Sequence, residues 1–433
     1  MKKNKIYIID VTNRDGVQTS RLGLAKLQKT MINILLNDMG VFGSEFGFPV
    51  THHETNYLNA NLELARKGVL KPIVLNGWIR AIKSDVKKAI ELTDVKNLNL
   101  SISTSEQMTR GKFLGKKTRA DVLRMMTDAV DYARKKNIKI LGVNAEDASR
   151  TDMPFLIKFA KAAKDHGADR IRYCDTLGYD DPFTIYKRVR ALAGEVKLPI
   201  ELHCHNDLGM VVACSIAGAK AAIDAGCDAY INTTINGMGE RAGNADLVSV
   251  ILAIKYSSGF SAEGEISPPA SPKRKRGEQS GGKGKYSLDE KIKLGHAWKI
   301  AKYASYAFGV PLPINQPGVG ANAFAHESGI HADGALKDRR NYELYDFEEL
   351  GRGEPEIIET GRQITAGEYS GIKGFRNVYE KLEIKFKNDK EATRILDLVR
   401  YANVHTQKPL THDELRFIGK YPDIAEKIFI MNP

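Results

Sequence analysis

The stretch IELHCHND, residues 200–207, decides how the rest of the chain is interpreted. It is typical of a short buried strand that runs into a loop, and side chains on a strand alternate between its two faces. Glu201, His203 and His205 therefore share one face. Two imidazoles at this spacing can bind one cation from the same side, because imidazole is a common ligand of divalent transition metals. The competing interpretation is two unrelated polar residues at the end of a strand.

The length and composition indicate a globular protein with a large core. The chain has 433 residues, of which 42% are hydrophobic and 27% charged, and this length suits two or three domains or one barrel with additions. No signal peptide is predicted, because the first residues lead directly into a short strand-like run, and no apolar run has the length of a membrane span. The four cysteines lack metal-type spacing and are expected to be reduced, which favours a cytoplasmic protein.

Short β-rich apolar runs alternate with longer amphipathic runs in the first part of the chain. The predicted strands are residues 5–11, 41–46, 71–75, 96–102, 138–143, 169–173, 199–203 and 228–232. The predicted helices between and after them include residues 22–39, 119–136, 153–166, 182–193, 211–225 and 242–257. Eight such strand–helix units predict a (β/α)8 TIM barrel, an α/β fold, over residues 1–259. A doubly wound open sheet is the alternative, but no glycine-rich dinucleotide turn follows the first strand.

A barrel brings the carboxyl ends of its strands to one mouth, where catalytic residues gather. Asp15, after the first strand, should lie near His203 and His205, because strands seven and one are two apart in a closed ring of eight. Two imidazoles and one carboxylate form a facial metal site whose open positions suit a bidentate 2-oxo acid. Arg14 could stabilise an oxyanion there, although a local Arg14–Asp15 salt bridge is the alternative. Polar residues also follow other strands: Glu45, Glu106, Asp175 and Thr176.

The chain beyond the barrel is predicted to contain three parts. Residues 260–286 form a flexible basic linker rich in Pro, Gly, Ser and Lys, to which residues 273–276 contribute the run KRKR. That run suggests nucleic-acid binding, but a solvated loop is favoured because no aromatic residue there could stack on a base. The net charge of +12 also suits small anionic substrates. Residues 287–370 are predicted to form a small α+β subdomain and residues 371–433 a helical region.

Within these parts, some elements are expected from local pattern. Residues 288–308 should be helical, 315–331 a loop rich in Gly and His, and 341–352 an extended segment. Two or three helices are predicted between residues 371 and 429, with 391–402 the clearest.

Four motifs together resemble the homocitrate synthase/isopropylmalate synthase family. They are DVTNRDGVQ at 10–18, HCHNDLG at 203–209, NGMGERAGN at 236–244 and HESGIH at 326–331. The resemblance covers about residues 5–370, and the order of the motifs makes it specific. It implies a metal-dependent barrel that condenses acetyl-CoA with a small-molecule 2-oxo acid. It also implies a homodimer, because in this family catalytic groups from the added segment often reach the barrel of a neighbouring subunit.

The resemblance assigns roles to individual residues. It implies Asp15, His203 and His205 as ligands of a divalent cation, for which Mn, Co, Zn and Mg all remain open. It places Arg14 beside the substrate keto group and implies a catalytic His331 with Tyr342 as its partner. The remaining positions that line the substrate are Gln18, Glu106, Thr176 and the catalytic-site residue Glu201. From its local sequence alone, His331 would be interpreted as a loop histidine.

The choice of 2-oxo acid depends on smaller features. A related lyase of hydroxymethylglutaryl-CoA carries a cysteine in the loop that here reads NGMGER, residues 236–241, so a synthase is favoured. The tail after Gly371 is short for the regulatory domain that isopropylmalate synthases usually carry. Asn13 and Val17 stand where homocitrate synthases usually have Leu and Glu, and the arginine that some of them place near Ile102 is missing.

The opening of the chain, including TSRLGL at 19–24 and FGFP at 46–49, is most similar to the Re-type citrate synthase branch of the family. This resemblance implies an acyltransferase that condenses acetyl-CoA with oxaloacetate to give citrate and CoA. Homocitrate synthase, which uses 2-oxoglutarate, is the second hypothesis, and 2-isopropylmalate synthase is the third. Nucleic-acid binding through the basic linker is the hypothesis from a different class.

Overall fold

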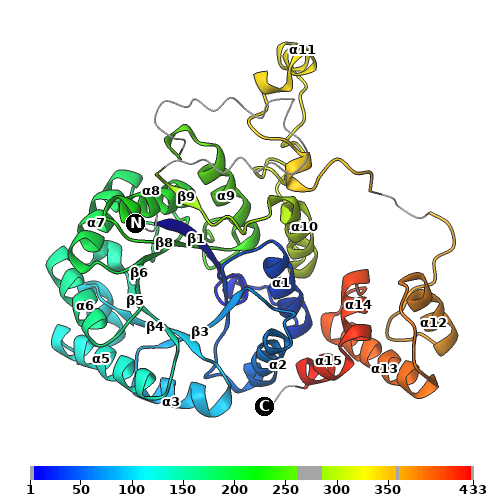
Figure 1. Cartoon of the computed structure of the whole chain (residues 1–433), viewed down its shortest axis with the longest axis horizontal. Coiled ribbons are helices and arrows are strands. Elements are labelled where there is room, and N and C mark those ends of the chain that lie inside the picture. Colours follow the sequence, from blue (N-terminus) through cyan, green and yellow to red (C-terminus); the bar gives the residue numbers. More distant parts are fainter. Residues whose placement is uncertain (1–3, 261–284, 357–359, 431–433) are drawn as a thin grey trace.

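The computed structural model describes residues 4–260, 285–356 and 360–430. Its centre is a closed barrel of eight parallel strands with helices around the outside, as predicted (Figure 1). The strands are β1 (Lys5–Asp10), β2 (Gly43–Gly47), β3 (Val74–Arg80), β4 (Asn97–Ser103), β5 (Ile140–Glu146), β6 (Arg170–Asp175), β7 (Ile200–Cys204) and β8 (Ala229–Thr233). The third strand begins at Val74, later than predicted, because Pro72 has no backbone N–H to donate to a neighbouring strand.

The barrel closes through β1, which pairs with β8 on one side and with β2 on the other. Ile6 to Asp10 lie in register with Ala229 to Thr233 of β8, and Ile9 lies opposite Gly43 of β2. A two-residue strand, β9 (Ser287–Leu288), pairs with the first residues of β1, where β2 has not yet begun. Closure therefore places β7 two strands away from β1, and their carboxyl ends share the mouth.

The helices around the barrel follow the predicted alternation with the strands. They are α1 (Lys26–Asp38), α2 (Thr55–Arg66), α3 (Lys83–Leu92), α4 (Glu106–Lys112), α5 (Arg119–Lys135), α6 (Met153–Asp165), α7 (Pro182–Val196), α8 (Val211–Asp224) and α9 (Leu247–Tyr256). Side-chain caps set several of their starts. Asp181 accepts hydrogen bonds at the start of α7, where Pro182 occupies the first turn. Similarly, α9 begins at Leu247 rather than at residue 242, because the Asp246 carboxylate caps it at the Ser249 N–H.

The two faces of the strands differ in chemistry. Leu98 and Leu100 of β4 are fully buried in the apolar layer between the sheet and the helices. The inner face is polar instead: Arg172 of β6 reaches Glu45 of β2, and Arg170 reaches Asn99 of β4. These contacts cross between strands that are not neighbours, so they lie inside the barrel. The interior under the mouth is thus filled by paired polar groups rather than by the branched apolar side chains common in this fold class.

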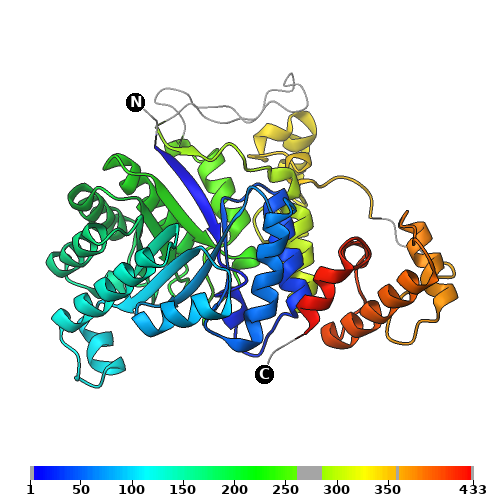
Figure 2. The same ribbon diagram turned by 60° about the horizontal axis from the view of Figure 1, so that its bottom comes forward.

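The chain beyond the barrel is mainly helical in the part described. Its helices are α10 (Ala297–Phe308), α11 (Gly329–Lys337), α12 (Ile372–Lys381), α13 (Asp389–Thr406), α14 (His412–Lys420) and α15 (Pro422–Phe429). In Figures 1 and 2, α10 and α15 lie beside the α1 and α2 edge of the barrel. By contrast, α11 contains no buried residue and stands away from the barrel at the top of Figure 1.

Several predictions for this part need correction. Residues 288–308 are α-helical only from Ala297, after a 3-10 turn at Leu294–His296, and Ser287 and Leu288 extend the sheet as β9. The extended segment predicted at 341–352 is wrong: Asp338 and Asp346 accept hydrogen bonds from backbone N–H groups two residues on and favour turns. The tail has four helices rather than two or three. The linker predicted at 260–286, with the run KRKR, lies almost wholly outside the described residues. No helix among the described residues has the length and apolar character to cross a membrane.

Candidate active site

Three side chains that could bind a metal converge at the barrel mouth. The Nε2 atom of His203 lies 3.1 Å from Oδ2 of Asp15, and that of His205 lies 3.8 Å from the same oxygen. One ligand atom from each of the three residues lies within 4.8 Å of the others, and all three side chains are buried. The predicted triad is therefore brought together in the folded chain.

Local structure explains how each triad residue is aimed. His203 lies on β7 and His205 directly follows this strand, so alternation directs both rings to the inner face. The rings are 5.1 Å apart and nearly perpendicular. After β1 the chain turns sharply, with the N–H groups of Arg14 and Asp15 both donating to the carbonyl of Val11. This turn presents the Asp15 carboxylate to the rings.

Asn232 and Asn244 orient the triad. Asn232 Nδ2 donates to Glu201 at 2.7 Å, so its oxygen, 3.1 Å from His203 Nδ1, accepts a hydrogen bond from that ring nitrogen. Nδ1 of His203 then carries the proton, and Nε2 has a free lone pair for a cation. Asn244 donates to Asp15 at 3.1 Å, and its own buried oxygen has no hydrogen-bond partner among the described residues.

The protonation states suit cation binding. Burial alone would raise the pKa of Asp15, but the charge of Arg14, together with the neighbouring His203, outweighs this and holds the pKa well below its usual range. Burial, reinforced by the neighbouring His203, lowers the pKa of His205 to about 3. An anionic carboxylate and a neutral imidazole are the forms that bind metal ions. The donor set therefore fits a divalent cation.

An ionic network lies directly beneath the triad. Glu45 accepts from Arg14 Nε at 2.5 Å and from Arg172 Nη2 at 2.7 Å, and Glu201 accepts from Arg172 at 2.5 Å and from Arg170 Nε at 2.6 Å. Burial would raise the pKa of Glu45, but the two arginines overcome it and lower that pKa to about 2. The network fixes Arg14 at the floor of the mouth beside Asp15.

The predicted residue Glu201 belongs to this network rather than to the open mouth. It is fully buried, and both of its oxygens accept hydrogen bonds from the arginines and Asn232. Its contact with the triad runs through Asn232 to His203. In this position Glu201 can orient the metal-binding ring without itself touching a substrate.

Two predicted substrate residues lie at the strand ends around the mouth. Gln18 ends the short 3-10 turn that follows Asp15 and is exposed. Thr176 follows β6, where its hydroxyl accepts the Asp147 N–H at 2.9 Å and its carbonyl accepts from Arg241. Both therefore border the mouth.

Glu106 is placed differently from the prediction. It is the first residue of α4, its side chain is 60% exposed, and it pairs with Arg110 one turn along the same helix. The inward-facing carboxylate on this side of the barrel is Glu146, the last residue of β5, which accepts from Ser103 Oγ at 2.5 Å and pairs with Lys112. Sequence reasoning missed Glu146 because the predicted strand ended three residues early, and it quoted Asn244 within a motif without giving it a role.

His331 and Tyr342 are brought to each other but not to the triad. Their rings stack with centroids 4.1 Å apart, and both side chains are exposed. His331 lies on α11, which is at the top of Figure 2, whereas β1 runs downward from the N-terminus toward the mouth. Within one chain, the predicted catalytic pair therefore lies apart from the predicted metal site.

Comparison with known proteins assigns the chain to a family. Residues 5–266 match the family model described as HMGL-like. The chain belongs to the HMGL-like family. Residues 319–406 match a second model, described as the homocitrate synthase post-HMGL domain-like family. HMGL-like proteins are metal-dependent, and in this member Asp15, His203 and His205 form a possible metal site.

Relatives within the HMGL-like family align over nearly the whole chain. The citrate (Re)-synthase of Dehalococcoides mccartyi is 58% identical over 431 residues, with 99% of each chain covered. A protein named 2-isopropylmalate synthase 2, from Caldanaerobacter subterraneus, is 38% identical with 98% of each covered, and homocitrate synthase 1 of a Nostoc species is 32% identical with 95% and 96% covered. The solved HMG-CoA lyase of Bacillus subtilis shares the fold, with a TM-score of 0.51 at 19% identity over 72% of this chain and 97% of that one.

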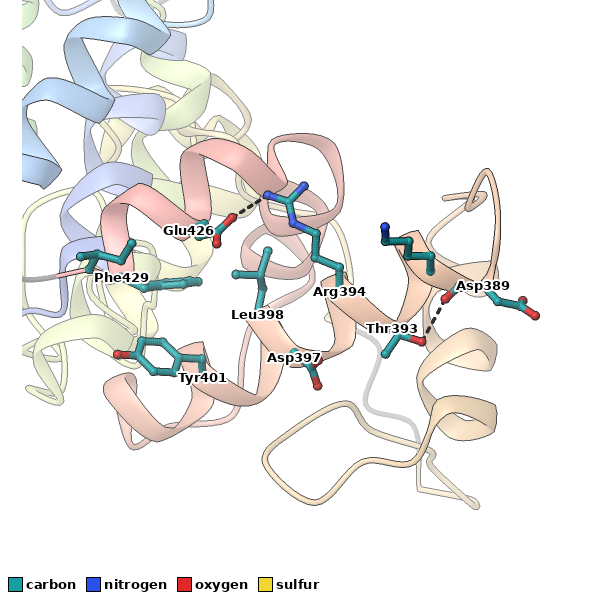
Figure 3. A pocket seen from close by; sticks show the side chains of 10 residues that line it. Asp389, Thr393, Arg394, Asp397, Leu398, Tyr401, Glu426 and Phe429 are labelled. Atoms are coloured by element: carbon teal, nitrogen blue, oxygen red, sulfur yellow. Dashed lines mark hydrogen bonds and ion pairs between the residues drawn. The ribbon is translucent and has the colours of Figure 1, made fainter.

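The C-terminal helices carry a concave region that lies away from the triad. A groove of 760 Å³ separates α13 from α15 (Figure 3), with Leu398, Tyr401 and Phe429 along it and an ion pair between Arg394 and Glu426 at its rim. All of its lining residues come from these two helices and Ile430 after them. The groove is therefore separate from the triad, and nothing in the structure shows what covers it.

Proposed function

We propose that this chain is a Re-type citrate synthase, an acyltransferase that condenses acetyl-CoA with oxaloacetate to give citrate and CoA. The observation that carries the proposal is the buried triad of Asp15, His203 and His205, set beside Arg14 at a barrel mouth. The full-length relative at 58% identity, named citrate (Re)-synthase, supports oxaloacetate as the substrate. We place the enzyme in the cytoplasm, where its four free, buried cysteines would stay reduced.

The triad and Arg14 would act on the 2-oxo acid. A divalent cation held by Asp15, His203 and His205 supplies Lewis-acid polarisation of the keto group when bound. The Arg14 guanidinium lies 3.3 Å from Asp15 and is fixed by Glu45, so its positive charge needs no rearrangement as the keto oxygen becomes negative. The exposed Gln18 and the half-buried Thr176 would hold the substrate carboxylates at the edge of the mouth.

The other half of the reaction needs a base for the acetyl-CoA methyl group. We assign this role to His331, with Tyr342 stacked on its ring. After the methyl proton is removed, the methyl carbon bonds to the keto carbon, and the keto oxygen takes up a proton to become a hydroxyl. Water then hydrolyses the thioester to release CoA. The distance between α11 and the mouth supports a homodimer in which His331 serves the partner's barrel. Glu201 would act by orienting His203 through Asn232.

Homocitrate synthase is the second candidate, because residues 319–406 match a domain named after it. Isopropylmalate synthase stays third, although a relative of that name is as short as this chain, so a short tail alone does not exclude it. Lyase activity is disfavoured by the absence of cysteine from the loop at residues 236–241. We give the basic run at residues 273–276 no role in nucleic-acid binding.

The decisive experiment measures CoA thiol release with acetyl-CoA and one 2-oxo acid at a time. Purified, metal-loaded protein should turn over oxaloacetate and leave 2-oxoglutarate and 2-oxoisovalerate essentially unused. Chromatography of the product should identify citrate. Turnover with 2-oxoglutarate alone would replace the proposal by homocitrate synthase. A variant without residues 268–284 should react at the unchanged rate, since the proposal gives this segment no part in the chemistry.

A further inference from the structure

The side of the mouth that faces the triad is formed by the ends of β3, β4 and β5. Three half-buried side chains lie there on the inner face: Trp78, Ser101 and Glu146. Glu45 and Arg172 lie deeper, because both are fully buried in the ionic network. A substrate that contacts Arg14 and the triad must therefore extend over this network toward the half-buried side chains. Trp78 is the largest of them.

The Trp78 indole is fixed by three contacts. The guanidinium carbon of Arg14 lies 5.4 Å from the centre of the ring, within the range of a cation–π interaction. The Phe48 ring packs edge-on against the indole, with centroids 5.7 Å apart at 78°. With its amide oxygen turned toward the two donors, Asn144 accepts from Trp78 Nε1 and Arg172 Nη1, both at 3.2 Å. The indole therefore has one defined position.

The loop that carries Phe48 is also anchored. The Phe48 N–H donates to Glu54 at 2.8 Å. Glu54 in turn accepts from Lys26 and Lys29, each at 2.6 Å, in a buried cluster between α1 and α2. This chain of contacts anchors the backbone of Phe48, whose ring packs against the indole.

We propose that Trp78 is a specificity-determining residue, whose indole limits the pocket to a 2-oxo diacid of four carbons. The inference rests on the proposed function, since it takes Arg14 as the group beside the keto carbon. Substrate atoms next to Arg14 would then also contact the Trp78 indole, which lies against the Arg14 guanidinium. The second carboxylate of oxaloacetate lies one methylene closer to the keto carbon than that of 2-oxoglutarate. A fixed wall at this point admits the shorter acid and excludes the longer one.

The first test compares kcat/KM for oxaloacetate and for 2-oxoglutarate in Trp78→Ala and Trp78→Phe. Trp78→Ala should lower the preference for oxaloacetate at least about tenfold, the scale set by one methylene. Trp78→Phe should have an intermediate effect, because it keeps an aromatic face for Arg14 but loses the N–H bonded to Asn144. The matched control is Trp298→Ala on α10, whose ring contacts Arg352 and Lys302 rather than Arg14. This control should leave the preference unchanged.

The second test needs no turnover. The chain has two tryptophans, so Trp298→Phe leaves Trp78 as the only one. Titration with oxaloacetate should change its emission saturably, whereas 2-oxoglutarate at equal concentration should not. The variant Trp78→Phe, with Trp298 alone, should show no response to oxaloacetate.

The outcomes separate this inference from the proposed function. If the wild type uses oxaloacetate but folded Trp78→Ala keeps its preference, Trp78 does not select the substrate and the proposed function stands. If the fluorescence emission of Trp78 does not change when oxaloacetate is added, the inference is also contradicted, even if Trp78→Ala fails to fold. If the wild type uses only 2-oxoglutarate, the proposed function fails and the four-carbon limit fails with it.

Discussion

The residues of the triad offer a possible cation one carboxylate and two imidazole rings. Asp15 stays ionised because Arg14 and His203 outweigh the effect of its burial on the pKa. His205 stays neutral because burial, with His203 close by, lowers its pKa to about 3. Asn232 and Asn244 then orient the ligands by hydrogen bonds. Binding should therefore depend strongly on the ligands and more weakly on the asparagines that orient them.

The residue-scale prediction concerns metal content. His203→Ala should lose the bound divalent cation and the activity while the barrel stays folded, because it deletes one of three ligands. Asn244→Ala should keep the ligands but bind about 10–100-fold more weakly, as is usual when an orienting partner is removed. Elemental analysis of the purified protein measures the bound metal, and calorimetric titration with Mn²⁺ and Co²⁺ measures the affinity. The wild type stripped by a chelator should regain activity when the cation is restored.

The control for this series is His412→Ala, which removes an exposed imidazole from the first turn of α14. It should bind metal like the wild type. Full metal content in His203→Ala, with a circular dichroism spectrum like that of the wild type, would show that the ligand assignment is wrong.

At the scale of elements, α1 and α2 are joined by the buried cluster of Lys26, Lys29 and Glu54. The Lys29 ammonium lies over the Tyr57 ring at 4.7 Å as well as against Glu54. Burial would raise the pKa of Glu54, but the two ammonium groups prevail and lower it to about 2. The carboxylate is thus more stable in the fold than in the unfolded chain. Because Glu54 also holds the Phe48 N–H, the cluster ties these helices to the mouth.

The element-scale prediction is an acid-dependent loss of stability. The folded pKa of Glu54 lies below the usual 4.5, so its contribution is present above about pH 4.5 and is lost as the pH falls through about 2. Glu54→Gln should lower the free energy of unfolding at pH 7 by roughly 3 kcal/mol. The difference between wild type and variant should shrink steadily between pH 5 and pH 2. Urea unfolding at a series of pH values measures it.

Glu63→Gln on α2, the helix that directly follows Glu54, is the matched control, since Glu63 pairs with Lys67 and Lys427 at the surface. Exposed ion pairs contribute little, so this variant should differ from the wild type by less than about 1 kcal/mol. Equal effects of the two substitutions at every pH would contradict the role given to the buried cluster.

At the scale of the whole molecule, the residues proposed to act in catalysis lie in two separate places of one chain. The possible metal site lies at the barrel mouth, whereas His331 and Tyr342 lie with α11, which has no buried residue. Ile330 and Leu336 of this helix are 75% and 88% exposed. Apolar side chains this exposed favour contact with another surface. A second copy of the chain would provide one and would complete the site.

The corresponding prediction is complementation between two inactive variants. His203→Ala and His331→Ala should each be inactive alone. If His331 serves the partner's barrel, a mixed dimer contains one site with both residues intact. Co-refolded mixtures should then recover roughly a quarter of the wild-type activity, the share expected for random pairing of two subunits. Light scattering coupled to gel filtration should report a dimer in every sample.

The informative contrast is a mixture of His203→Ala with Asp15→Asn. Both substitutions damage the same barrel site, so no pairing restores an intact one and no activity should return. Recovery in neither mixture, with all variants folded and dimeric, would mean that His331 acts within its own chain or not at all.

The sequence predicted the barrel well, because alternating periodicities and helix stops are local signals. It predicted the triad because strand alternation and ring closure together determine which residues meet at the mouth. Glu146 was missed for a local reason, because its strand was predicted to end at residue 143. Glu106 was expected at the substrate from the family resemblance, but it lies on the outer helix α4 and pairs with Arg110. The link from Asn244 to Asp15 was missed for a global reason, since a contact between residues 229 positions apart has no local pattern.

The ionic interior beneath the mouth restricts how this active site can be altered. Each of Glu45, Arg172 and Glu201 pairs with two partners, so replacing one of them with a neutral residue leaves one unbalanced charge in the buried network. Removing one member of such a pair costs about 3–5 kcal/mol. Natural or engineered substitutions at these positions are therefore tolerated only when several of them change together. On the proposal made for Trp78, substrate range is better altered at the half-buried Ser101 and Trp78, because neither side chain carries a charge of this network.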